Sequence, residues 1–114
     1  MKILLIDDEA EVLDALSEQL DRLGHQVIKM GGGFEALAYL ESGRHVDLIL
    51  TDVVMPRMDG WEVLETVRTR WPTVRIGIIT GRPDIQGRFE SPDILLTKPV
   101  RTKDLDGELS ALGI

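Results

Sequence analysis

Four short runs of aliphatic residues in this chain are each followed closely by polar side chains. The runs cover residues 3–6, 48–50, 76–79 and 94–96, and the polar residues after them are Asp7 and Asp8, Asp52, Thr80 and Lys98. Between the runs lie segments whose apolar residues recur at helical spacing. This alternation predicts repeated strand and helix units around a parallel sheet rather than a helical bundle.

The helical segments have recognisable beginnings and ends. The first starts at the acids Glu9 and Glu11 and stops at Gly24, and the second ends near Gly43. A third helix stops before Pro72, and Leu105, Leu109 and Leu112 form one face of a C-terminal helix. We predict five strands, at residues 3–6, 27–28, 46–50, 74–79 and 94–96. The near-continuous apolar runs at 3–6 and 76–79 indicate interior strands that are covered on both faces.

Residues 81–93 do not fit this pattern. They contain Pro83, Gly87 and Pro92, which leave room for about two helical turns at most. We therefore expect the helix between the fourth and fifth strands to be short or irregular.

Length and composition limit the classes of protein to consider. The 114 residues suit one domain, residues 1–114, with no output domain attached. The net charge of −7, from 13 basic and 20 acidic residues, disfavours direct binding of nucleic acid. The chain has no cysteine, which excludes thiolate catalysis and cysteine-bound metals, and no apolar run reaches the length of a membrane span. A cytoplasmic protein with no membrane contact is the simplest interpretation.

The strand-end residues predict a site for a cation and a phosphoryl group. Strand ends of a parallel sheet meet at one edge, so Asp7, Asp8 and Asp52 should lie together there. Three carboxylates about 5 Å apart repel by roughly 3 kcal/mol per pair, which favours a divalent cation such as Mg²⁺ between them. With Thr80 and Lys98 beside it, an aspartate becomes a competent nucleophile toward phosphorus.

At these residues the chain resembles the receiver domain of two-component response regulators. The matching elements are Asp7-Asp8-Glu9, Asp52 to Pro56 with Gly60 beyond, Thr80-Gly81 and Lys98-Pro99. Each element alone is weak, but the ordered set at successive strand ends is specific, and it covers essentially the whole chain. The resemblance implies a doubly wound, flavodoxin-like three-layer sandwich, with helices on both faces of a five-stranded parallel sheet in the order 2-1-3-4-5.

The resemblance also implies roles for single residues. Asp52 would accept a phosphoryl group, and Asp7, Asp8, Asp52 and the carbonyl of Val54 would hold Mg²⁺. Thr80 and Lys98 would bind the phosphoryl group, and the Lys98-Pro99 peptide would be cis. The chain would then be a signalling phosphoacceptor that catalyses only its own phosphorylation and dephosphorylation.

The implied partners are a sensor histidine kinase or a histidine phosphotransferase, and a downstream protein target. The oligomeric state stays open, and a phosphorylation-dependent dimer is one option. The chain departs from the family at Leu95, where Phe or Tyr is usual, and in its short fourth-helix region, so the read-out of the switch is in question. We also expect Val54 and Arg82 to flank the attacking water and to slow loss of the phosphoryl group.

Three alternatives come from other classes. A degenerate receiver that binds partners without phosphorylation would fit Leu95 and the short fourth-helix region, although the acidic cluster argues against it. A haloacid-dehalogenase-like phosphohydrolase would need a second acid two residues after its nucleophile, where this chain has Val54. A flavodoxin-like cofactor carrier is disfavoured because the first loop offers carboxylates rather than amides and hydroxyls to a phosphate.

Overall fold

The computed structural model describes residues 1–81 and 91–113, which form a parallel sheet between two layers of helices. The strands are β1 (Lys2–Ile6), β2 (Gln26–Met30), β3 (Leu48–Asp52), β4 (Arg75–Thr80) and β5 (Ile94–Thr97). The helices are α1 (Ala10–Arg22), α2 (Gly33–Glu41), α3 (Gly60–Arg70) and α4 (Thr102–Ala111). The strand order is β2-β1-β3-β4-β5 and every pairing is parallel, which confirms the predicted fold.

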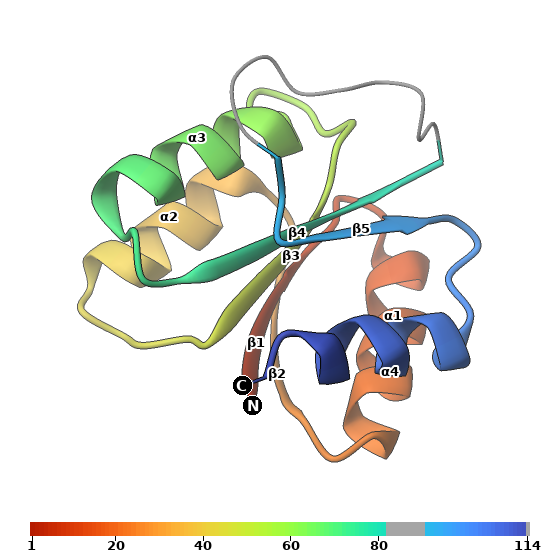
Figure 1. Ribbon diagram of the computed structural model, residues 1–114. Helices are drawn as coiled ribbons and strands as arrows, with labels where there is room; N and C mark the ends of the chain where they lie inside the picture. The colour runs from red at the N-terminus through yellow and green to blue at the C-terminus, as the bar shows by residue number, and fades with distance from the viewer. Residues whose placement is uncertain (82–90, 114) are drawn as a thin grey trace.

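Helices cover both faces of this sheet. Figure 1 shows α2 and α3 on one face and α1 and α4 on the other. Successive residues of β1 alternate between the two layers, because side chains of a strand point to opposite faces in turn. Leu4 and Ile6 pack in the layer of α2 and α3, whereas Ile3 and Leu5 pack in the layer of α1 and α4. This double burial explains why the run at residues 3–6 is apolar throughout.

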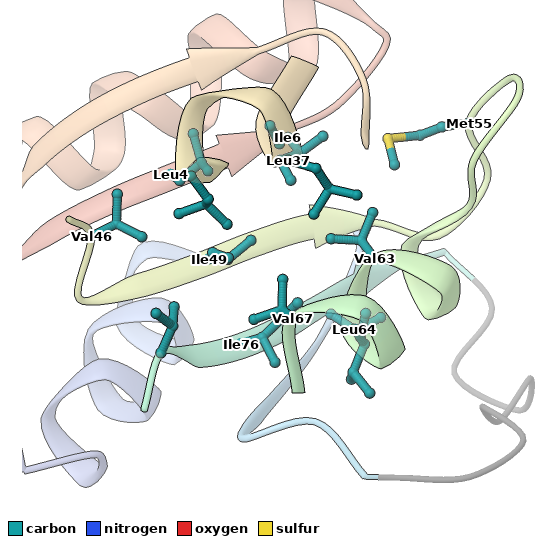
Figure 2. Packing of buried hydrophobic residues seen from close by; sticks show 14 of the residues in the cluster. Leu4, Ile6, Leu37, Val46, Ile49, Met55, Val63, Leu64, Val67 and Ile76 are labelled. Atoms are coloured by element: carbon teal, nitrogen blue, oxygen red, sulfur yellow. The ribbon is translucent and has the colours of Figure 1, made fainter. Parts of the chain in front are cut away.

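Helix α3 packs tightly against the sheet that includes β3, the strand that carries Asp52. Val63, Leu64 and Val67 of α3 are almost fully buried, and Figure 2 shows them facing Ile49 and Ile76 of the sheet. The beginning of α3 is fixed by a capping box. The Asp59 side chain accepts a hydrogen bond from the Glu62 backbone N–H, and the Glu62 side chain accepts one from that of Asp59.

Both ends of the third strand lie two residues later than predicted. The third strand was expected over residues 46–50 but is Leu48–Asp52, so Asp52 is its last residue rather than a loop residue. Val46 is buried before the strand begins, which is why its hydrophobicity looked like part of the run. The predicted helix between β4 and β5 falls mainly on residues 82–90, which lie outside the described residues.

Candidate functional site

The carboxyl ends of β1 and β3 bring three aspartates together. Ile6 pairs with Thr51 in the parallel register, so Asp7 and Asp52 follow at neighbouring positions. Carboxylate oxygens of Asp7, Asp8 and Asp52 all lie within 4.8 Å of one another. Asp7 is 2% exposed and Asp52 is 7% exposed, whereas Asp8 is exposed to solvent. The sequence predicted this cluster, and the structure forms it.

Lys98 provides the positive charge beside this cluster. Its Nζ atom lies 3.3 Å from Asp7 Oδ2 and 3.2 Å from Asp52 Oδ1. The backbone N–H of Lys98 donates to the carbonyl of Thr80 at 2.8 Å, which fixes the residue beside the end of β4. The Lys98-Pro99 peptide is cis, as the resemblance implied.

Thr80 is the last residue of β4 and is buried. In the register of β3 with β4, Asp52 pairs with Ile79, so Thr80 follows directly after the partner of Asp52.

The other residues singled out in the sequence lie at the surface or outside the described residues. Leu95 is 45% exposed and lies on the edge strand β5. Val54 is 74% exposed. Arg82, the other residue predicted to affect phosphoryl lifetime, lies outside the described residues.

The electrostatics of the site reflect burial of like charges. Burial raises the pKa of Asp52, the negative charge of Asp7 raises it further, and Lys98 offsets only part of this. For Lys98, burial alone would lower the pKa, but the carboxylates of Asp52 and Asp7 outweigh it and raise the pKa. Both shifts show how strongly the three groups interact.

The donor set fits a hard divalent cation. The site holds three carboxylates and one ammonium group, which leaves two negative charges there when all are ionised. Oxygen ligands in a partly buried acidic pocket are what Mg²⁺ prefers, and it commonly uses one or two carboxylates together with a phosphate. The residues present therefore suit Mg²⁺.

Some features of the site were not predicted from the sequence. Arg57, in the loop after β3, has a positive φ of 71° and contacts α2, although nothing in its local sequence marks it. Gly60 lies so close to β3 that a Cβ atom there would be 2.3 Å from the carbonyl oxygen of Asp52. The motif spacing pointed to Gly60, but only the structure shows why a side chain does not fit there.

Comparison with known proteins identifies the family. The family model of the response regulator receiver domain matches residues 3–109 of the chain. The chain belongs to the response regulator receiver family. The alkaline phosphatase synthesis transcriptional regulatory protein PhoP of Bacillus subtilis is 31% identical over 97% of this chain and 48% of its own length. AfsQ1 of Streptomyces coelicolor is 34% identical over 96% of the chain and 50% of its own length. The chain thus spans about half the length of these curated relatives.

Solved receiver structures share the fold. A response regulator receiver domain protein from Clostridium thermocellum superposes with a TM-score of 0.86 at 30% identity, covering 96% of this chain and 91% of its own. The response regulator TrrA from Thermotoga maritima, solved in complex with Mg²⁺ and BeF, gives a TM-score of 0.89 at 26% identity, covering 97% of both chains. No helix in the described part of this receiver is long and apolar enough to cross a membrane.

Proposed function

We propose that this receiver accepts a phosphoryl group on Asp52 from the phosphohistidine of a histidine kinase or histidine phosphotransferase, with Mg²⁺ as cofactor. The observation that carries the proposal is the buried Asp52 carboxylate within 4.8 Å of Asp7 and Asp8 and 3.2 Å from the ammonium of Lys98. The Mg²⁺ and BeF complex of the related TrrA supports the same chemistry.

In the proposed reaction, an oxygen of Asp52 forms a bond to phosphorus while the phosphorus–nitrogen bond of the phosphohistidine breaks. The electron pair of that bond returns to the imidazole of the donor. The Lys98 ammonium, now shared by two carboxylates, would bind an oxygen of the incoming group, and the Thr80 hydroxyl would donate to another.

Asp7, Asp8, Asp52 and the backbone carbonyl of Val54 would hold Mg²⁺, which supplies positive charge against the phosphoryl oxygens. Phosphorylation would then bias the receiver toward a second conformation that a downstream protein recognises. The kinase and the target are part of this proposal.

The experiment that tests it is phosphorylation by acetyl phosphate in the presence of MgCl₂, followed by intact-protein mass spectrometry. We expect wild type to gain one phosphoryl group that hydroxylamine removes, and Asp52→Asn to gain none. Asp14→Asn is the matched control, because Asp14 is an exposed carboxylate that pairs with Lys29 at 3.0 Å, on the outer side of α1.

Labelling of Asp52→Asn at the wild-type rate would refute Asp52 as the acceptor. A wild-type protein that stays unmodified, with acetyl phosphate and with phosphorylated kinases alike, would instead support a receiver that works without phosphorylation.

A further inference from the structure

The loop between β3 and α3 contains an unusual turn at Arg57. Arg57 has a φ of 71°, and it is the one non-glycine residue in the described part of the chain with a positive φ. The backbone N–H of Met58 donates to the carbonyl of Pro56 at 2.8 Å, which closes a three-residue turn around Arg57. A positive φ and this bond are the features of the strained form of the γ-turn. Surrounding contacts must therefore hold the turn in place.

The Arg57 side chain makes two such contacts with the first turn of α2. Its Nη2 atom donates to Glu35 Oε1 at 3.2 Å. The guanidinium carbon also lies 5.7 Å from the centre of the Phe34 ring, within the range of a cation–π contact. Phe34 is 50% exposed. We call Arg57, Glu35 and Phe34 the α2 clamp.

The α2 clamp joins the two segments that continue into the acidic site. On one side, the loop that carries Arg57 follows directly after Asp52, the last residue of β3. On the other side, α2 follows β2, and the carbonyl of Met30 at the end of β2 accepts a hydrogen bond from the Asp7 backbone N–H at 3.2 Å. A movement of the loop away from α2 would thus change the position of the backbone beyond Asp52 relative to Asp7.

We propose that Arg57 is a positioning residue for the metal site, because its clamp on Glu35 and Phe34 holds the strained loop in its binding conformation. This inference rests on the proposed Mg²⁺ site. Releasing the clamp lets the loop leave the strained turn, so a smaller fraction of molecules is ready to bind. The apparent dissociation constant rises in inverse proportion to that fraction.

The chain contains a matched control at the other end of α2. Arg70 is the last residue of α3, and its Nη1 atom lies 2.6 Å from Oε1 of Glu41 in α2. Its guanidinium carbon lies 4.5 Å from the ring centre of Trp71. This arrangement has the same chemistry as the α2 clamp, an arginine paired with a glutamate of α2 and stacked on an aromatic ring. It lies at the end of α3 away from Asp52, so its loss should leave the metal site intact.

The test is an NMR titration of the full chain with MgCl₂, with thermal unfolding measured in parallel. We expect Arg57→Gln and Glu35→Gln each to weaken Mg²⁺ binding by about three- to tenfold, the effect of losing an exposed ion pair and stacking contact. Arg70→Gln should leave Mg²⁺ affinity at the wild-type value. The charge-exchanged double variant Arg57→Glu with Glu35→Arg should recover part of the lost affinity.

Equal Mg²⁺ affinity in wild type, Arg57→Gln and Glu35→Gln would overturn the inference, even if the variants unfold at lower temperature. Equal weakening in Arg70→Gln would overturn it as well, because the effect would then be one of general stability. Failure of the proposed function gives a different result, since wild type itself would then stay unmodified by acetyl phosphate or show no Mg²⁺ binding at Asp7 and Asp52.

Discussion

Substituting Gly60 by alanine should destabilise this receiver, although the same change usually favours a helix. Gly60 begins α3, and it does not have a positive φ, so its backbone suits alanine. An added Cβ atom, however, would lie 2.3 Å from the carbonyl oxygen of Asp52 and 3.0 Å from the Cα atom of Val53. Both are backbone atoms of the segment that carries Asp52, so neither can move aside as the end of a flexible side chain could.

The size of the expected loss of stability follows from the shift of α3 that the added Cβ atom requires. Relief of the contact requires α3 to shift by about 1 Å, which strains the 2.9 Å hydrogen bond from the Gly60 N–H to the Val53 carbonyl and the packing of Val63, Leu64 and Val67. Overpacking of this kind costs about 1–3 kcal/mol and the weakened hydrogen bond about 1 kcal/mol more, against a gain in helix propensity of at most about 1 kcal/mol. We expect the free energy of unfolding to fall by about 2 kcal/mol in total.

For a domain of this size the unfolding entropy is about 0.24 kcal/mol/K, so this loss corresponds to a fall in Tm of about 8 °C. Gly107→Ala is the control, because Gly107 lies exposed within α4 and a Cβ atom there would meet nothing within 4 Å. That variant should gain up to about 1 kcal/mol from helix propensity. The assay is thermal and urea unfolding followed by circular dichroism. A Gly60→Ala protein as stable as wild type would refute the steric argument.

Three further predictions concern an acid, an ion pair and the loop after Asp52. The N–H of Lys2 donates to Asp47 at 2.7 Å and holds the pKa of that carboxyl below its ordinary value. Its stabilisation is therefore present above the unfolded-state pKa and lost as pH falls through the folded-state pKa, so Asp47→Asn should flatten the fall in Tm below about pH 4. Asp93→Ala removes a partly buried partner 3.1 Å from Arg68 and should cost about 2 kcal/mol in urea unfolding. Val54→Asn should shorten the lifetime of the phosphorylated protein, because an exposed polar group replaces an exposed apolar one two residues after Asp52.

Each of these predictions has a result that would contradict it. A Tm profile of Asp47→Asn parallel to wild type in acid would exclude the proposed contribution of that carboxyl. Asp14→Ala, which removes an exposed ion pair with Lys29, should cost no more than about 0.5 kcal/mol, and an equal loss in Asp93→Ala would show that burial does not matter there. An unchanged decay rate in Val54→Asn would remove Val54 from the control of phosphoryl lifetime.

Much of the fold and of the candidate site could be predicted because the signals are local. Strands buried on both faces need continuous apolar runs, as at residues 3–6, and the chain shows them openly. Parallel strands must end at a common edge, so the side chains that follow them are bound to converge there. This geometric necessity is why Asp7 and Asp52, 45 residues apart in the sequence, could be placed together in advance.

Other features depend on contacts that the sequence does not reveal. Leu95 could be identified as a departure from the family and placed in the fifth strand, but only the structure shows that it is 45% exposed. The boundary of β3 was placed two residues early because Val46 is buried without belonging to the strand.

The sequence by itself determined the sheet, its layers and the acidic edge, because periodicity and strand ends are properties of neighbouring residues. The tertiary structure alone decided how closely Lys98 approaches Asp7 and Asp52, and which helix holds the strained turn at Arg57. Those distances are set by the packing of segments that are remote in the sequence. The charges at this edge could thus be predicted, but their coupling, and with it the raised pKa of Asp52, arises only once the fold brings them within a few ångströms.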